Sequence, residues 1–401
     1  MGGMRWLILP CLLVASTAWA APDKATLRGQ VDAFAELHDR YQGLLGRRTE
    51  LKQRVDALDA TLRELAADGS ADPQRAAELA AEHESAQAAY AEFERPRSEL
   101  WKTRIELEGA GGKLELALTA ALEAGEDPEL RLWRGELFAR LERYAAALPD
   151  AQAAAFARPE DPRALVLLGR CAVVQNRFKD AEGLFGEAVR RQPTAEVWAL
   201  LAVARYCRNR FRAAREAFAN AEPADVPPRL LRRCQALLEP GALATLEVAW
   251  AEEQKLRETP GPRIALSLGE REVVIELFAD AAPQPVAKLL ERVRAGKLGD
   301  APVQRVLTNL AVFVGATVRR DPSQEVAADP ALPRRHHFRG SVSLEHRGDD
   351  AVGYGPGLVI ALTPAPRLDA RHLVVGRVVS GQAAWDAAQE GQRITAARVV
   401  E

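Results

Sequence analysis

The stretch DPRALVLLGRCAVVQNRFKDAEGLFGEAVRRQP, residues 161–193, shows how most of this chain is organised. Its apolar residues recur at helical spacing on both sides of Asn176-Arg177, which is typical of two amphipathic helices joined by a short turn. Gly169 and Ala181 are small where two helices must approach closely, and Leu168 and Phe185 fill the gap between them. The stretch therefore predicts a pair of packed helices.

The same pattern occurs on either side of this pair. Seven positions recur 34 residues apart, as Asp127-Pro128, Gly135, Tyr144, Ala147, Ala154 and Pro159, and as Asp161-Pro162, Gly169, Phe178, Ala181, Ala188 and Pro193. A weaker third copy begins near Asn209-Arg210-Phe211 and ends at Pro223. A period of 33–34 residues with small residues at the helix crossings resembles the tetratricopeptide repeat. That resemblance implies an α-solenoid over 107–258 with one or two closing helices.

Such an array has two possible uses. Its concave face could bind an extended peptide or a protein partner, as stacked repeats commonly do. A short array could instead serve only as a rigid spacer. The sequence leaves both open.

Residues 21–106, ahead of the repeats, carry two further helical patterns. Apolar residues from Leu27 to Leu65 recur mostly at three- and four-residue spacing, which predicts a long helix compatible with a coiled-coil seam. Turn residues at 69–73 end it, and a second stripe runs from Leu79 to Ile105. We expect an antiparallel helical hairpin, which is either a projecting dimerisation or spacer arm or a hairpin packed on the rest of the chain.

Residues 1–20 have the parts of a secretory signal peptide. Arg5 supplies a positive charge, an apolar run follows, and Ala18-Trp19-Ala20 is a small-residue cleavage site. The run is shorter than the roughly 20 residues that span a bilayer. We therefore expect an exported protein, periplasmic or extracellular, without a membrane span after cleavage; the alternative is a retained anchor, including a lipid on Cys11.

Composition excludes some function classes. Lys and Arg (54) nearly balance Asp and Glu (56), for a net charge of -2. A general nucleic-acid binder needs a surplus of basic residues, so no nucleic-acid partner is expected. Cys171, Cys207 and Cys234 lie far apart and do not resemble a metal site. Cys171 and Cys207 fall within helical patterns, where we expect buried free thiols, and the alternative is a single disulfide among the three.

At Thr259-Pro260-Gly261-Pro262 the helical patterns give way to short strands. Residues 264–268 and 273–277 predict a β-hairpin, 286–294 a short helix, and further strands are expected within 303–318, 340–344, 358–362 and 373–379. Many strands and few helices over 259–401 predict a closed β-barrel with short helices over its openings. The whole chain is thus expected to be a multidomain α + β protein.

Segments of this barrel region resemble cyclophilins in order and spacing. The opening hairpin and first helix (274–278, 282–287), Gln304-Arg305-Val306, the strand 339–344 and above all PAPRLDARHLVVGRV at 364–378 carry the resemblance. It implies a peptidyl-prolyl cis-trans isomerase that uses no cofactor and no metal, and whose client is a proline-containing peptide or protein.

The resemblance also implies which residues form the site. Arg305 matches the family's catalytic arginine, and Leu368 and His372 match two positions of the proline pocket. Phe313 stands where a Gln normally orients the arginine. The other substrate-binding positions also depart from the family's pattern, and they are Leu310, Ala311, Glu345, His346, Gly357, Val359 and Arg367.

Two functional hypotheses follow. The first is a folding or assembly factor of the cell envelope, whose repeats hold a partner while a degenerate proline pocket retains weak isomerase activity. The second is a non-catalytic cyclophilin-fold scaffold or peptide-binding protein. The hypotheses differ in whether the pocket around Arg305 still accepts and turns over proline.

Overall fold

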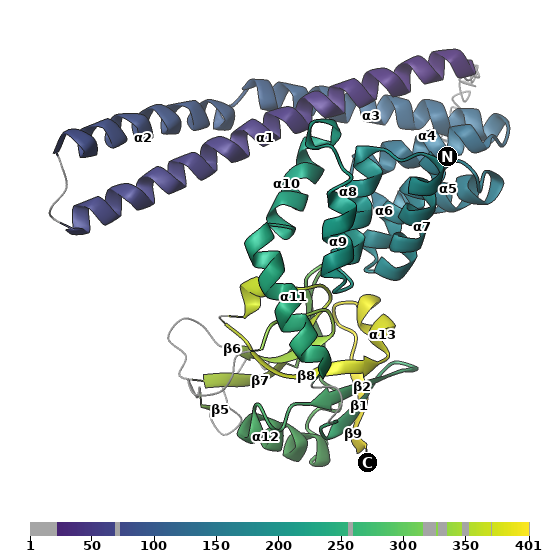
Figure 1. Cartoon of the computed structure of the whole chain (residues 1–401). Helices are drawn as coiled ribbons and strands as arrows, with labels where there is room; N and C mark the ends of the chain where they lie inside the picture. Colours follow the sequence, from purple (N-terminus) through teal and green to yellow (C-terminus); the bar gives the residue numbers. More distant parts are fainter. Residues whose placement is uncertain are drawn as a thin grey trace, which may run out of the picture.

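The structure is a computed structural model of the chain, and it describes residues 22–68, 73–255, 260–315, 326–327, 335–346, 353–369 and 371–400. Helices form the N-terminal part and a curled sheet the C-terminal part, as predicted for a multidomain α + β protein (Figure 1). The predicted signal peptide and most of the turn at 69–73 lie outside the described residues.

The N-terminal hairpin consists of α1 (Lys24–Asp68) and α2 (Pro73–Glu94). Ion pairs join the two helices, with Arg54 2.8 Å from Glu82 and Arg48 2.5 Å from Glu94. The prediction that the second helix continues to Ile105 is wrong. The helix ends at Glu94, just before Pro96, and a new helix, α3 (Glu99–Ala124), begins behind an N-cap Ser98 that accepts a hydrogen bond from Trp101 N at 3.2 Å.

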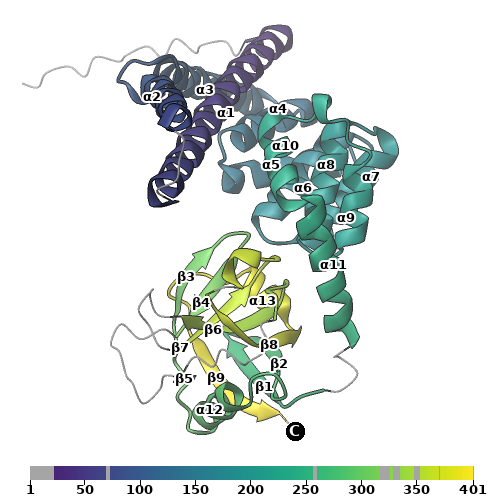
Figure 2. The same ribbon diagram turned by 60° about the vertical axis from the view of Figure 1, so that its left-hand side comes forward.

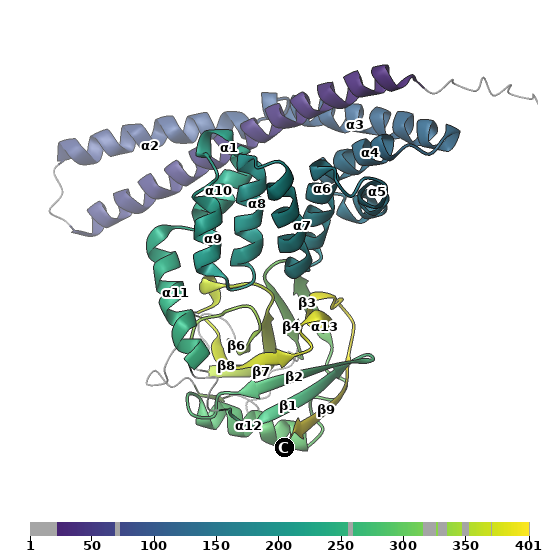
Figure 3. The ribbon, with the colours of Figure 1, turned by 45° about the vertical axis from the view of Figure 1, so that its right-hand side comes forward.

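Part of the hairpin is packed on the rest of the chain. The first turns of α1 are packed, because Leu27 and Phe34 share a buried cluster with Leu114, Leu118 and Trp133 of the helices beneath. The last turns of α1 run with α2 beyond the repeats (Figure 3). The use of this part as a dimerisation or spacer arm stays a prediction.

The repeats form as the period predicts. Their helices are α4 (Pro128–Arg140), α5 (Tyr144–Ala157), α6 (Pro162–Val174), α7 (Phe178–Arg191), α8 (Ala195–Tyr206) and α9 (Phe211–Phe218), followed by η1 (Pro223–Asp225), α10 (Pro228–Leu237) and α11 (Pro240–Lys255). Asp127 and Asp161 cap the first two repeats by accepting hydrogen bonds from backbone N–H groups two residues on, with Pro at the first helical position. Fully buried Phe178, Phe185 and Phe211 fill the core between successive pairs.

The C-terminal part is one antiparallel sheet that curls around a single core. Within the described residues it has nine strands, in the order β3-β4-β7-β6-β8-β2-β1-β9, with β5 beside β7. Their bounds are β1 (Arg263–Leu268), β2 (Arg271–Leu277), β3 (Val303–Leu307), β4 (Ala311–Val314), β5 (Val326–Ala327), β6 (Ser341–His346), β7 (Gly353–Ala361), β8 (Leu373–Ser380) and β9 (Ile394–Val400).

The two ends of this sheet meet. Val303 N donates to Gln392 O at 2.7 Å, and Ile394 N donates to Ala301 O at 2.9 Å. The helices α12 (Pro283–Arg294) and α13 (Gln382–Asp386) pack against the core, in which Trp385 is fully buried. The prediction was a closed β-barrel with short helices over its openings, and the structure is a curled antiparallel sheet whose ends meet, with two short helices packed on its core.

The barrel is docked against the last repeats, and α11 runs along its side (Figure 2). Phe338 of the barrel enters the repeat core, with its ring centre 4.8 Å from that of Trp250 and 5.9 Å from that of Phe211. Beside it, Glu253 of α11 pairs with Arg335 at 3.2 Å and with Arg377 at 3.3 Å. These contacts hold the barrel and the repeats together through buried apolar and charged groups.

The three described cysteines are free and buried. Burial raises the pKa of the Cys171 and Cys207 thiols to about 11 and that of Cys234 to about 12. None of the helices in the described ranges is long and apolar enough to cross a bilayer.

Candidate functional site

The first feature of the site is a contact between neighbouring strands. The antiparallel register of β3 and β4 places Arg305 opposite Phe313. Cζ of Arg305 lies 4.2 Å from the centre of the Phe313 ring, which is cation–π geometry. Arg305 is exposed and Phe313 is buried, so the ring supports the guanidinium at the barrel surface.

Beneath this contact lies a small buried apolar cluster. Its six members, each at most 9% exposed, are Leu310, Ala311, Phe313, Val359, Ala365 and Leu368. β4 and β7 pair Phe313 with Val359, and the short helix η4 (Pro366–Leu368) brings Leu368. The structure thus brings together five of the residues expected in the proline pocket. Ala365 was missed, although it lies in the segment of strongest cyclophilin resemblance, three positions before Leu368.

His372 lies at the edge of the cluster. Its ring stands edge-on to Phe313, with the ring centres 6.4 Å apart, and 6.2 Å from the ring of His337. His337 is fully buried, and its Nδ1 lies 2.7 Å from Oδ1 of Asp369. A row of side chains therefore runs from Asp369 through two histidines to the Phe313 ring.

The second oxygen of Asp369 lies 2.7 Å from Nδ1 of His336. Burial alone would raise the pKa of Asp369, but hydrogen bonds from His336 and from the side chain and backbone of His337 lower it below its usual value. The hydrogen bond with Asp369 raises the pKa of His336, against the opposing effect of burial. These three residues were not predicted at the site, although Asp369 lies within the segment of strongest cyclophilin resemblance and His336 and His337 come just before the resembling strand 339–344.

The other predicted site residues do not belong to the cluster. Gly357 is buried in β7, two positions before Val359, while Arg367 is exposed on η4. Glu345 is half-buried on β6, and the backbone of His346 pairs with Tyr354 of β7. These four residues lie on β6, β7 and η4 and are not members of the cluster.

This arrangement joins two chemical functions. An exposed guanidinium can donate hydrogen bonds to a nitrogen or oxygen that gains electron density. The adjacent cluster and the His372 edge offer apolar and aromatic contacts. Together they suit a substrate that is apolar on one side and polar at a nearby backbone atom.

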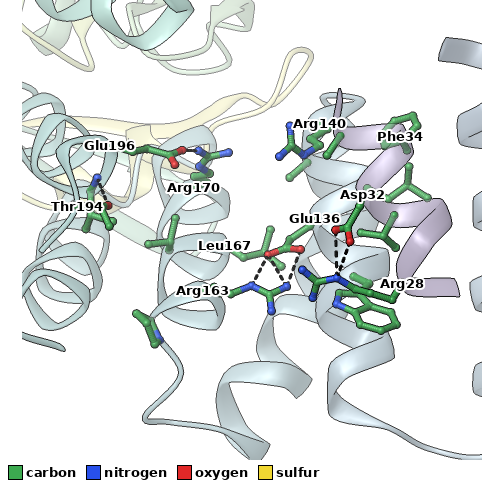
Figure 4. A pocket seen from close by; sticks show the side chains of 18 of the residues that line it. Arg28, Asp32, Phe34, Glu136, Arg140, Arg163, Leu167, Arg170, Thr194 and Glu196 are labelled. Carbon is green, nitrogen blue, oxygen red and sulfur yellow. Dashed lines mark hydrogen bonds and ion pairs between the residues drawn. The ribbon is translucent and has the colours of Figure 1, made fainter. Parts of the chain in front are cut away.

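A second candidate site is a groove in the repeats. A cavity of about 450 Å³ is lined by residues of α1, α3, α4, α6 and α8, among them Val31, Phe34, Leu137 and Leu167 (Figure 4). Its polar wall consists of ion pairs, including Arg163 with Glu136 at 3.0 Å and Arg28 with Asp32 at 3.0 Å, and the pair Arg170–Glu196. The groove therefore offers an apolar floor between alternating charges.

Comparisons with known proteins give matches for both the C-terminal region and the repeats of this chain. The family "Cyclophilin type peptidyl-prolyl cis-trans isomerase/CLD" matches residues 263–401, and "Tetratricopeptide repeat" matches residues 107–162 and 138–204. A "Peptidyl-prolyl cis-trans isomerase" of Helicobacter pylori is 26% identical over 134 residues, which are 33% of this chain and 80% of that protein. An Arabidopsis thaliana "Peptidyl-prolyl cis-trans isomerase CYP21-4" is 26% identical over 147 residues, 36% of this chain and 61% of that protein.

Among solved structures, a cyclophilin type peptidyl-prolyl cis-trans isomerase of Cryptosporidium parvum is similar to this chain. It has 16% sequence identity and a TM-score of 0.30, and the match covers 35% of this chain and 98% of that one. The family match over 263–401, with the repeat matches before it, identifies the C-terminal region of this chain as a cyclophilin-type domain that follows tetratricopeptide repeats.

Proposed function

We propose that this protein is a prolyl isomerase of the cell envelope, with a degenerate proline pocket, and that its repeats hold the client. The observation that carries the proposal is the position of Arg305, whose guanidinium is exposed over the Phe313 ring and beside the apolar cluster. Among the described residues, no carboxylate forms an ion pair with Arg305. The cyclophilin-type match over 263–401 supports the same reaction.

Prolyl isomerisation requires the protein only to stabilise the twisted state of the peptide bond. The peptide bond before proline rotates slowly because its C–N bond has partial double-bond character. In the twisted state that resonance is lost, and the prolyl nitrogen regains a lone pair. A guanidinium N–H of Arg305 can donate to this nitrogen, which stabilises the twisted state relative to the planar one. Contacts of the proline ring with the cluster would hold the bond beside Arg305.

We expect the turnover to be slow. Leu310, Ala311 and Val359 provide less aromatic area than the residues that cyclophilins have there. Each missing ring or hydrogen-bond donor costs on the order of 1–3 kcal/mol of peptide binding. The groove of the repeats would compensate by holding the client elsewhere, through its apolar floor and alternating charges. The signal-like residues 1–20 support export to the periplasm or beyond.

The experiment compares prolyl isomerisation by the full chain with that by Arg305→Ala and Arg305→Lys. We expect Arg305→Ala to lower kcat/KM at least about tenfold, and Lys to recover only part, because it lacks the planar fork of donors. Arg63→Ala is the control, since Arg63 is exposed on α1 and pairs only within that helix, with Asp59 at 2.6 Å, among the ion pairs of the described residues. A rate equal to that of buffer for the unaltered chain would contradict the proposal.

The alternative is a non-catalytic peptide-binding or scaffolding protein. One observation favours it: the cluster residues are at most 9% exposed, so little of the pocket floor is open to a proline ring. In that case, proline-containing peptides would bind without accelerated isomerisation. Exchange spectroscopy by NMR on a labelled Ala-Pro peptide distinguishes the two, because it reports binding and cis–trans exchange separately.

A further inference from the structure

The helical repeats reach the strand pair that carries the candidate catalytic arginine. We infer that Asn176, in the turn between α6 and α7, is a positioning residue for Arg305 and Phe313. The inference rests on the proposed function only where it concerns isomerisation. The contacts of Asn176 are present whether or not the protein is an isomerase.

Asn176 forms a hydrogen-bonded bridge to the barrel. Its side-chain oxygen Oδ1 accepts from Asn309 N at 3.0 Å, and its Nδ2 donates to Asp386 O at 3.1 Å. The residue is 4% exposed. A buried amide that satisfies two backbone groups of another domain is a specific contact, because removing it leaves both groups without that partner.

Asn309 is the centre of the turn between β3 and β4. It has a φ of 57°, and Leu310 N donates to Leu307 O at 2.9 Å to close the turn. Thr363 Oγ1 donates to Asn309 O at 2.9 Å, so the two backbone groups of Asn309 are held from opposite sides. One of these two anchors belongs to the repeats.

The turn determines the register of the hairpin. Leu307 pairs with Ala311, Val306 with Val312 and Arg305 with Phe313. Leu310, next to Asn309, belongs to the apolar cluster beneath the Phe313 ring. A looser turn would therefore widen the spread of positions of the guanidinium over the ring, and displacements below 1 Å are enough to slow a reaction that depends on orientation.

The next repeat provides a matched comparison. Asn209 occupies the same position between α8 and α9, with a φ of 61° and 6% exposure. Its amide also bridges to the barrel, accepting from Arg339 N at 2.9 Å and donating to Arg339 O at 3.2 Å. Among the described residues its side-chain hydrogen bonds go to Arg339 and not to the β3–β4 turn. Asn209 therefore shares the backbone conformation and the docking role of Asn176 but not its hydrogen bond to that turn.

The first repeat shows that this turn does not itself require Asn. Glu142 stands at the equivalent position with a φ of 60°, and it pairs with Arg229 of α10 instead of the barrel. Asn thus occurs in the two turns that contact the barrel, where its amide can satisfy an N–H and a C=O together. The presence of Asn is therefore explained by its hydrogen bonds to the barrel and not by the backbone conformation of the turn.

The test compares Asn176→Ala with Asn209→Ala in the full chain. The first readout is hydrogen–deuterium exchange of the amides in residues 303–314, followed by mass spectrometry. We expect exchange there to become about tenfold faster in Asn176→Ala and to stay within about twofold in Asn209→Ala. The second readout is isomerisation, in which Asn176→Ala should lower kcat about three- to tenfold with little change in KM.

Asn176→Asp refines the comparison. It keeps an oxygen to accept from Asn309 N and loses the donor to Asp386 O, so its exchange over 303–314 should lie closer to that of the unaltered chain than to that of Asn176→Ala. If Asn176→Ala does not fold, hydrogen–deuterium exchange is measured on Asn176→Asp in its place.

The outcomes separate this inference from the proposed function. Equal exchange over 303–314 in the two Ala variants would overturn the inference, whatever the activity. Turnover no faster than buffer in the unaltered chain would overturn the proposed function, while the exchange measurement would still decide the role of Asn176.

Discussion

The guanidinium of Arg305 is held by the ring of Phe313, 4.2 Å away across the β3–β4 pair. The cyclophilin resemblance implies a Gln at the position of Phe313, and that Gln would orient the arginine through hydrogen bonds. Here an aromatic face supports the cation without using its N–H groups as donors to the protein at that contact. The arginine can therefore be both oriented and available to a substrate.

Replacing this ring tests that relationship. Phe313→Leu keeps the site apolar but removes the cation–π contact, which is worth about 0.5–1 kcal/mol at an exposed site. We expect kcat/KM for prolyl isomerisation to fall about two- to fivefold. Phe278→Leu is the matched control, because Phe278 supports Arg335 in the same way at 3.9 Å but lies at the junction with the repeats. Equal loss of activity in both variants would contradict the assignment.

Local features of the sequence were enough to predict the architecture. The 34-residue period, the small Gly169 opposite Phe185 and the alternating strands after Pro262 depend on neighbours within one helix pair or one hairpin. Such short-range patterns are readable from sequence because the same residues that form an element also bury its face.

The site was harder to predict because its geometry comes from long-range contacts. The resemblance placed Arg305, Leu368 and His372, but it could not show that the cluster beneath Phe313 is almost fully buried. Nor could periodicity show that Asn176, part of a repeat signature, reaches a barrel turn more than a hundred residues away. A hydrogen bond from a side chain to a distant backbone group depends on how the two domains dock. Docking of domains produces no periodic pattern in the sequence.

Helix packing in the repeats predicts opposite effects for two glycines. A Cβ on Gly169 would lie 2.5–2.9 Å from carbons of the Phe185 ring, whereas a Cβ on Gly183 would meet nothing within 4 Å. We expect Gly169→Ala to lower the free energy of unfolding by about 1–3 kcal/mol through overpacking. Gly183→Ala should raise it by up to about 1 kcal/mol through helix propensity. Urea unfolding followed by circular dichroism measures both, and equal effects would contradict the packing described.

The buried charges at the junction predict how the two parts depend on each other. Glu253 contacts Arg335 and Arg377, and Arg377 also pairs with Glu276 at 3.0 Å; all four side chains are at most 12% exposed. Removing Glu253 leaves Arg377 with the buried Glu276, and Arg335, among the described residues, with only the exposed Asp280, 3.6 Å away. We expect Glu253→Ala to lower the free energy of unfolding by about 3–5 kcal/mol.

Glu216→Ala is the control for this loss. Glu216 pairs with Arg212 at 3.0 Å, but both side chains are more than half exposed. Its removal should cost less than about 1 kcal/mol because water screens the pair. If both variants changed the urea midpoint equally, the junction charges would not hold the domains together.

The His336–Asp369 pair predicts a pH dependence of stability. Its hydrogen bond with Asp369 raises the pKa of His336 above the ordinary value of 6.5, with a smaller contribution in the same direction from Glu252 of α11, while burial opposes the shift. The same contact lowers the pKa of Asp369, so the carboxylate stays ionised across the neutral range. A raised folded-state pKa means that the protonated histidine stabilises the fold below about pH 6.5, and that this contribution disappears as the pH rises through the folded-state pKa.

We therefore expect the difference in unfolding free energy between the unaltered chain and His336→Asn to be largest near pH 6 and to shrink towards pH 9. The difference should stay below about 1 kcal/mol, since about a third of the His336 side chain is exposed. Urea unfolding at several pH values measures it. In an Asp369→Asn background the same substitution should show little pH dependence, because the carboxylate that raises the pKa is gone; a difference that grows with pH in the original chain would mean that His336 is neutral in the folded state.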